Sequence, residues 1–263
     1  MFAFPKHLLA ILAAMSATPA WAVTIWPIGD SLTSGFTVAG AYRPSLYNNL
    51  IRAGEPVTFV GSSTADATTT LTTTGQFRHD GHSSWFIADT PGSSMDNGKG
   101  LYESVQSWHA TIPSPQVILL MIGTNDLNLN NSVSTASGRF ALLLSRLEGL
   151  SPSARIIVGA VPKASETNRY KDASVTTLNA SIQSYNNSIS AVVAAHAANG
   201  KKVEFLDVNA AMTLADLGSD GLHFSQAGYN KLGSLWASAV LIPEPNTLLL
   251  LLLSLFCMGI RRR

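Results

Sequence analysis

Three apolar runs constrain the fold of this chain more than any other feature. They cover residues 23–28, 117–122 and 156–161, and each stops at a glycine or a proline. Apolar runs of this length, without regular alternation, are typical of strands that are buried on both faces of a sheet. Because helical patterns separate the runs, the chain is expected to form a parallel sheet with helices on both sides.

Two further runs, at residues 57–61 and 203–208, add two strands, which makes five. Apolar residues at helical spacing predict helices over residues 41–51, 100–109, 133–150, 174–199 and 225–240. A stretch rich in serine and threonine, residues 62–76, has no periodicity and is predicted to be a surface loop. The fold class is therefore α/β.

Polar side chains gather in three loops of the predicted domain. The three loops are Gly29-Asp30-Ser31, Gly123-Thr124-Asn125-Asp126 and Asp220-Gly221-Leu222-His223. Parallel strands all point the same way, so loops at their carboxyl ends meet at one edge of the sheet. We therefore expect these loops to form one site.

The residues of the three loops suit nucleophilic catalysis by a serine. Ser31 can attack, His223 can take its proton, and Asp220 can orient the imidazole. The Asn125 side chain and the Ser31 backbone N–H can donate hydrogen bonds to an oxyanion. Each residue also has a plain structural interpretation, as a turn residue, a helix cap or a surface histidine.

The three loops resemble the first, third and fifth sequence blocks of the SGNH hydrolases, also called GDSL esterases. The resemblance spans about residues 23–240. It implies a flavodoxin-like three-layer α/β/α sandwich with a five-stranded parallel sheet, and ester hydrolysis without a metal or cofactor. It also implies that Ser31 is the nucleophile, His223 the base, Asp220 its partner and Asn125 an oxyanion donor.

A further stretch, Asp80-Gly81-His82-Ser83-Ser84-Trp85, looks like part of the acetylxylan-esterase branch, carbohydrate esterase family three. In that branch a glycine supplies a backbone N–H to the oxyanion hole. The aligned position here is Ser84, which can serve only if its backbone adopts the required angles. Gly81 is the alternative donor, and the sequence leaves the choice open.

Composition and charge exclude several other classes of site. His79 and His82 lie three residues apart, but no clustered carboxylate or cysteine completes a metal site, so we predict no metal. The formal net charge is +1, which gives no support for nucleic-acid binding. The single cysteine, Cys257, lies near the C-terminus, so the domain is expected to have neither a disulfide nor a thiol nucleophile.

The N-terminus has the pattern of a signal peptide. Lys6 and His7 precede an apolar segment, and Ala20-Trp21-Ala22 closes it. We predict cleavage after Ala22 and export of the mature chain. The alternative is an apolar N-terminal helix that is not removed.

The C-terminus has the pattern of a sorting signal over residues 243–263. Pro243-Glu244-Pro245 precedes an apolar run that is short for a membrane span, and three arginines end the chain. This arrangement resembles the PEP-CTERM signal, which implies transient anchoring in the inner membrane and recognition by an exosortase-type processing enzyme. The alternative is an ordinary membrane anchor.

These observations favour an exported serine esterase that acts on an acylated carbohydrate, with residues 23–242 as the hydrolase domain. It would face the periplasm while anchored and reach the cell surface or extracellular matrix after processing. A lipid-directed esterase or lysophospholipase is the nearest alternative, but no apolar acyl groove is evident in the sequence. A non-catalytic carbohydrate-binding protein on the same fold is the other alternative, although it would be expected to lose Ser31 or His223.

Overall fold

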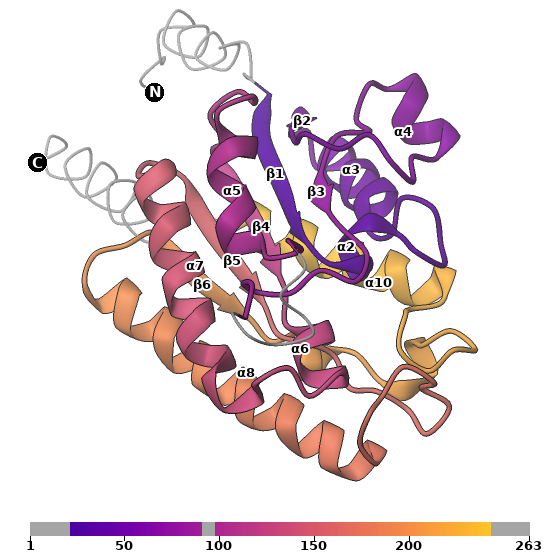
Figure 1. Cartoon of the computed structure of the whole chain (residues 1–263). Helices are drawn as coiled ribbons and strands as arrows, with labels where there is room; N and C mark the ends of the chain where they lie inside the picture. The colour runs from indigo at the N-terminus through magenta and orange to yellow at the C-terminus, as the bar shows by residue number, and fades with distance from the viewer. Residues whose placement is uncertain (1–21, 91–97, 243–263) are drawn as a thin grey trace, which may run out of the picture.

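The fold is built on one parallel sheet, seen in a computed structural model that describes residues 22–90 and 98–242 (Figure 1). Five strands lie in the order β2-β1-β4-β5-β6, and all neighbouring pairs are parallel. The strands are β1 (Val23–Gly29), β2 (Val57–Phe59), β4 (Val117–Met121), β5 (Arg155–Gly159) and β6 (Val203–Leu206). The five predicted parallel strands are confirmed.

A sixth strand, β3 (Asp80–Gly81), was not predicted. It has only two residues and pairs with the carboxyl end of β1, where Ile28 lies opposite Asp80 and Gly29 opposite Gly81. Such a short segment carries no periodicity from which a strand could be recognised. Its position matters, because it brings residues 80–85 beside the loop that follows β1.

Helices cover both faces of the sheet, which gives the predicted three-layer sandwich (Figure 1). One face carries α3 (Arg43–Arg52) and α10 (Gln226–Leu241), which contribute Leu46, Leu50, Leu232 and Trp236 to one core cluster. The other face carries α5 (Leu101–His109), α7 (Ala136–Leu150) and α8 (Val175–Ala198).

Alternate residues of the central strands enter the two cores. Ile25, Leu119 and Ile157 pack with α3 and α10, whereas Trp26 and Ile118 pack with the helices of the opposite face. All five side chains are essentially inaccessible to solvent. Each contributes about 1.5–3 kcal/mol by leaving water, which explains why the strands are apolar on both faces.

Residues 62–76 are not entirely a loop, so that prediction is wrong in part. Helix α4 (Thr69–Thr73) lies within them, and the Thr68 side chain caps it by accepting the N–H of Leu71. Leu71 is fully buried in the core beside α3. One apolar residue in a run of threonines produces no periodic signal, although the packing of that residue is enough to hold a single turn.

Short helices follow several strands. They are α2 (Ser31–Ser34), α6 (Thr124–Asn128) and α9 (Val208–Ala211), with 3₁₀ turns η1 (Val133–Thr135) and η2 (Leu214–Asp216) elsewhere. The strand predicted over residues 203–208 ends at Leu206, because the Asp207 side chain caps α9 by accepting the N–H of Ala210.

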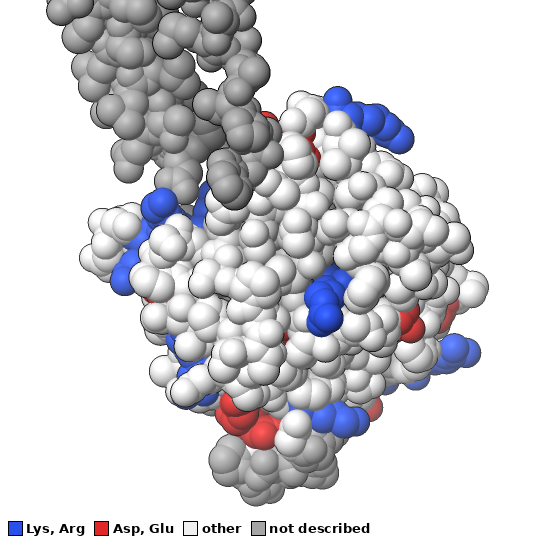
Figure 2. Space-filling model, turned by 90° about the horizontal axis from the view of Figure 1, so that it is seen from above, with Lys and Arg blue, Asp and Glu red and all other residues white. Residues whose placement is uncertain are grey.

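The first and last described elements meet at the amino edge of the sheet, where Val23 and Ile242 line one cavity. Seen from above, the surface is mostly uncharged, with blue side chains standing apart from one another (Figure 2).

Over residues 22–90 and 98–242, no helix has the length and apolar character needed to cross a membrane. The expected sorting signal, and the signal peptide up to residue 21, lie outside the described residues.

Candidate active site

Ser31 lies where the sheet meets the first short helix. It is the first residue of α2, and Asp30 caps this helix by accepting the N–H of Leu32 at 3.0 Å. Gly29, two residues before Ser31, has no room for a side chain, because a Cβ there would lie 2.2 Å from the carbonyl oxygen of Met121 on β4. The close approach of two strands therefore determines where the chain turns and where the Ser31 hydroxyl lies.

The structure brings Ser31, His223 and Asp220 into one hydrogen-bonded chain. The Ser31 Oγ lies 2.8 Å from His223 Nε2, and His223 Nδ1 lies 2.7 Å from Asp220 Oδ2. An imidazole nitrogen against a carboxylate carries the proton, so Nε2 is left as the acceptor for the serine hydroxyl. All three residues are buried, although 192 positions separate Ser31 from His223.

Asp220 is held in its ionised form. Burial alone would raise the pKa of its carboxyl group, but hydrogen bonds from the His223 side chain and from two backbone N–H groups outweigh burial and lower the pKa. The two backbone donors are Leu222 at 3.1 Å and His223 at 3.0 Å, both to Oδ1. Because the other oxygen faces Nδ1, one carboxylate both shapes the loop and orients the imidazole.

Three residues with hydrogen-bond donors line the cavity at Ser31. Ser31, Ser84 and Asn125 all line the same cavity. Asn125 Nδ2 donates one hydrogen bond to the carbonyl oxygen of Trp85 at 2.8 Å, and an amide nitrogen has a second hydrogen to offer. Within the described part of the chain, the backbone N–H groups of Ser31 and Ser84 donate to no protein acceptor.

The alternative donor, Gly81, has its N–H engaged elsewhere. It donates to His79 Nδ1 at 3.0 Å, while His79 Nε2 contacts the carbonyl oxygen of Ala65 at 2.8 Å. Burial lowers the pKa of His79 to about 3, so its imidazole is neutral and Nδ1 can accept. The structure therefore leaves Ser84, rather than Gly81, with an available N–H.

Ser84 occupies a backbone position that favours glycine. Its φ is +65°, and it lies in a turn closed by a hydrogen bond from the Trp85 N–H to the carbonyl oxygen of His82. A residue with a positive φ at this place in a turn costs about 1 kcal/mol more for serine than for glycine. The neighbouring Ser83 Oγ lies 3.0 Å from Ser34 Oγ on α2, which ties the turn to the helix that carries Ser31.

The buried Asp80 carboxylate also holds the loop that carries Ser84 in place. It accepts the indole N–H of Trp26 at 2.6 Å and the backbone N–H of Ser62 at 3.0 Å. The Ser62 hydroxyl donates to it as well, and His82 Nε2 lies 3.4 Å away. Three separate segments thus meet at one carboxylate, which fixes the start of the loop that leads to Ser84.

A segment that the sequence did not single out also belongs to the site. Asn168 is fully buried, and its Nδ2 donates to Asn128 Oδ1 on α6 at 2.6 Å. Its Oδ1 accepts the N–H of Tyr170 at 2.9 Å, and Tyr170 lines the cavity beside His223. Asn168 therefore connects the helix that carries Asn125 to the wall of the cavity.

The same segment clamps the loop that carries Asp220 and His223. The Ser165 N–H donates to the carbonyl oxygen of Gly221 at 2.9 Å, and Gly221 has a φ of +73°. A Cβ there would lie 2.4 Å from Ser165 Oγ. One signal could have found this segment, since it follows β5 and so lies at the same sheet edge as the three predicted loops.

The cavity over Ser31 is small. Its volume is about 120 Å³, whereas pockets for drug-sized ligands measure roughly 300–1,000 Å³. It is lined by Ser31, Phe36, Ser83, Ser84, Asn125, Asn128, Leu129, Tyr170, Leu222 and His223. The cavity therefore has room for only a small chemical group.

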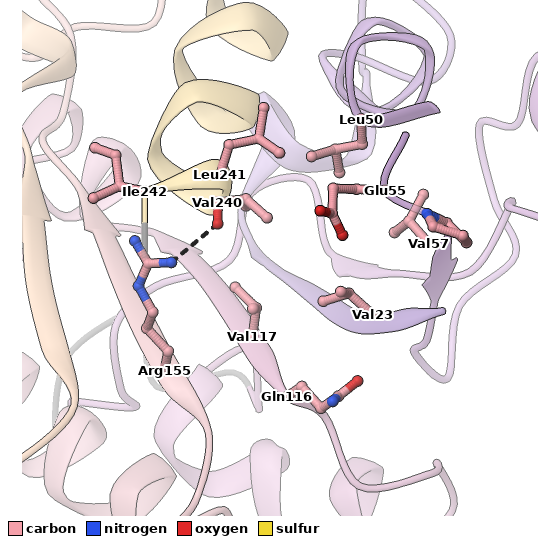
Figure 3. Close-up of a pocket in the computed structure, with 11 residues that line it drawn as sticks. Val23, Leu50, Glu55, Val57, Gln116, Val117, Arg155, Val240, Leu241 and Ile242 are labelled. Carbon is pink, nitrogen blue, oxygen red and sulfur yellow. Dashed lines mark hydrogen bonds between the residues drawn. The ribbon is translucent and has the colours of Figure 1, made fainter. Parts of the chain in front are cut away.

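A larger cavity lies at the opposite, amino edge of the sheet (Figure 3). Its volume is about 360 Å³, and apolar side chains such as Leu50, Val117 and Leu241 line much of it. Arg155 reaches into this region and donates to the carbonyl oxygen of Val240 at 3.1 Å (Figure 3). None of the predicted site residues lines this cavity.

The described residues contain no group of three or more His, Cys, Asp or Glu side chains that could hold a metal ion. Both ring nitrogens of His79 are engaged, as described above. The His82 ring stacks on Trp108 with 4.5 Å between centroids, and it also contacts Trp85. The two histidines that suggested a metal thus serve to hold the loop before Ser84.

Comparison with protein families identifies the domain. Residues 28–231 match the GDSL-like lipase/acylhydrolase family, and this match includes the Ser31, Asn125 and His223 loops. The chain belongs to the GDSL-like lipase/acylhydrolase family. Residues 241–263 match the PEP-CTERM protein-sorting motif, as the Pro243-Glu244-Pro245 pattern predicted.

The chain is also similar to individual proteins. It is 28% identical over 232 residues to a multidomain esterase of Ruminococcus flavefaciens; the alignment covers 85% of this chain but only 29% of that protein. A family 3 carbohydrate esterase structure from Clostridium thermocellum is 28% identical, with a TM-score of 0.66, and the match covers 83% of this chain and 94% of that one.

A further solved structure supports the fold of the domain. A carbohydrate esterase family 3 structure from Talaromyces cellulolyticus has a TM-score of 0.59 at 21% identity, and the match covers 83% of this chain and 96% of that one. The resemblance to carbohydrate esterase family three, expected from residues 80–85, is also found with the Clostridium thermocellum structure.

Proposed function

We propose that this chain is an exported serine esterase that removes short acyl groups, acetyl above all, from a carbohydrate. The observation that carries the proposal is the hydrogen-bonded chain from Ser31 through His223 to Asp220, with distances of 2.8 and 2.7 Å. This arrangement suits nucleophilic attack by a serine. It lies in a cavity that is also lined by Ser84 and Asn125, and the backbone N–H groups of Ser31 and Ser84 have no described protein acceptor.

In the first half of the reaction, Ser31 Oγ attacks the carbonyl carbon of the ester and its proton passes to His223 Nε2. The electron pair of the carbonyl bond moves to the oxygen, which the N–H groups of Ser31 and Ser84 and the Asn125 amide stabilise. The bond to the alcohol then breaks, and His223 Nε2–H protonates the alcohol oxygen as it leaves. An acyl group remains on Ser31.

In the second half, water attacks the acyl carbon and gives a proton to His223 Nε2. The oxyanion forms again in the same place, the bond to Ser31 Oγ breaks, and His223 returns the proton to that oxygen. Asp220 stays ionised throughout and stabilises the imidazolium that forms in each half. No cofactor takes part in this sequence.

Two observations favour an acetylated carbohydrate as the substrate. The cavity of about 120 Å³ suits a short acyl group rather than a fatty acyl chain. The carbohydrate esterase of family 3 shares 28% of its residues with this chain over nearly its whole length. An acetyl ester of a polysaccharide has both the short acyl group and the carbohydrate.

The test is a comparison of chromogenic esters on the purified chain. We expect 4-nitrophenyl acetate to be hydrolysed faster than the octanoate, and acetylated xylan to release acetate. Faster hydrolysis of the octanoate would favour a lipid-directed esterase. A complete lack of turnover with every ester would leave a carbohydrate-binding protein on the esterase fold.

We also propose that the C-terminal signal holds the protein only transiently in the inner membrane, with the domain facing the periplasm. The support is the match of residues 241–263 to the PEP-CTERM motif. An exosortase-type enzyme would cut near Pro243-Glu244-Pro245 and release the domain toward the cell surface. Mass spectrometry of the protein from its native host decides this, since an intact chain ending at Arg263 in the inner membrane would indicate a plain anchor.

A further inference from the structure

Phe36 is unusual among the aromatic residues of this protein. Its side chain is 54% exposed, whereas every other described Phe, Tyr and Trp is buried or half-buried. It lines the cavity over Ser31, and its ring centroid lies 5.1 Å from that of His223. An aromatic ring is thus presented to solvent directly beside the proposed general base.

The position of Phe36 is tied to that of Ser31. Its N–H and that of Gly35 both donate to the carbonyl oxygen of Ser31, at 3.4 and 3.0 Å. The end of α2 is held in turn by the fully buried Arg43, whose guanidinium donates to the carbonyl oxygen of Ser34 at 3.0 Å. The backbone that carries the ring is therefore fixed with respect to the nucleophile.

The chemistry assigns Phe36 to the alcohol side of the ester. His223 Nε2 must protonate the alcohol oxygen as it leaves, so the alcohol lies along the imidazole. Phe36 packs against that imidazole, and Tyr170 meets it edge-on with 5.9 Å between centroids. An acetyl methyl group inside the small cavity is too small to cover a ring that is 54% exposed.

We propose that Phe36 is a binding platform for the sugar ring that carries the ester, with Tyr170 as a second wall. One face of a pyranose presents C–H groups, and an aromatic ring gains dispersion and hydrophobic contact by lying against them. The hydroxyl groups at the edge of the sugar remain in water at the open side. This inference rests on the proposed esterase function and adds the part of the substrate that lies outside the cavity.

The experiment compares two acetyl esters on the full chain with Phe36→Ala. Acetylated xylobiose has a sugar as its alcohol, whereas ethyl acetate has an alcohol too small to cover the ring. We expect kcat/KM for acetylated xylobiose to fall about tenfold more than kcat/KM for ethyl acetate, mainly through KM. Phe36→Tyr keeps the ring and should restore the preference for the sugar ester.

Leu142→Ala is the matched control, because Leu142 is 58% exposed on α7 and does not line the cavity. It should change neither value by more than about twofold. Equal losses on both esters with Phe36→Ala would overturn the proposal, since the ring would then support His223 rather than bind the sugar. Equal retention of both activities would overturn it too.

The failure of the esterase proposal itself looks different. In that case the unaltered chain hydrolyses neither ester, before any substitution is made. Hydrolysis of ethyl acetate without hydrolysis of acetylated xylobiose would keep the esterase and overturn the platform.

Discussion

The two edges of the sheet offer cavities of opposite character. The cavity at the amino edge is the larger, at about 360 Å³, and it is lined by apolar residues with Glu55 and Arg155 among them. The cavity at the carboxyl edge has about a third of that volume, yet Ser31, Asn125 and His223 converge on it. The larger of these two cavities is lined by none of the predicted site residues.

The direction of the strands explains the difference. In a parallel sheet, every loop at the carboxyl edge leads from a strand into a helix, so polar turn and cap residues collect there. At the amino edge the chain enters the strands with residues such as Val23, Val57 and Val117, whose side chains continue the core. The chemistry therefore follows strand polarity rather than cavity volume.

The largest effect is expected from Ser31→Ala and His223→Ala. Each should lower kcat by about 10⁴-fold or more, and the double variant should be little worse because the residues act as a unit. His196→Ala is a matched control, since His196 also pairs with a carboxylate, that of Glu148 at 2.9 Å, but on the α7–α8 side of the sheet. If Ser31→Ala retained its activity, the active site could not be the one proposed at the carboxyl edge of the sheet.

Asn125→Ala comes next. It removes one donor to the oxyanion and the hydrogen bond to the carbonyl oxygen of Trp85, so kcat should fall by roughly 10²–10³-fold. Steady-state kinetics with an acetyl ester measures the change. A rise in KM with an unchanged kcat would instead make Asn125 a substrate-binding residue.

Asn168→Ala tests the connection that the sequence did not reveal. Loss of the side chain leaves Asn128 Oδ1 and the Tyr170 N–H without their partner, which should lower the free energy of unfolding by about 1–3 kcal/mol. We also expect kcat to fall about tenfold through misplacement of Asn125 and Tyr170. The neighbouring exposed Thr167→Ala should leave kcat within twofold, and a similar result for Asn168→Ala would reduce that residue to a stability role.

The buried His79 makes the carboxyl edge sensitive to acid. Burial lowers its pKa from 6.5 to about 3, so between these values the unfolded chain binds a proton that the folded chain does not. The free energy of unfolding should therefore decrease as the pH falls from about 6.5 toward 3. Urea unfolding at pH 7 and pH 5 measures this decrease, which should be smaller in His79→Gln; an unchanged difference would contradict it.

The smallest effect is expected at the amino edge. Glu55 is the carboxylate that lines the larger cavity, and Glu55→Gln should change kcat/KM for an acetyl ester by less than about twofold. A loss of tenfold or more would break the distinction between the two edges. The same assay that measures the Ser31 and Asn125 variants serves for this one.

The sequence was sufficient for the architecture because apolar periodicity is a local property. The runs at 23–28, 117–122 and 156–161 predicted strands, and the order of strands and helices predicted the parallel sheet. The loops at the strand ends then brought Ser31 and His223 to one edge, because all strands of a parallel sheet point in the same direction. Helix α4 was not predicted, because its single buried apolar residue, Leu71, produces no periodic pattern.

Only the tertiary structure distinguishes the backbone N–H groups of Gly81 and Ser84, and only it revealed Asn168. From the sequence, both backbone N–H groups are equally able to donate, but the folded chain places His79 Nδ1 against one of them and no described acceptor against the other. Asn168 gains its importance from Asn128, 40 positions away. Hydrogen-bond partners so distant along the chain leave no periodic trace in it, because the packing of separate loops, not local preference, brings their atoms within 3 Å.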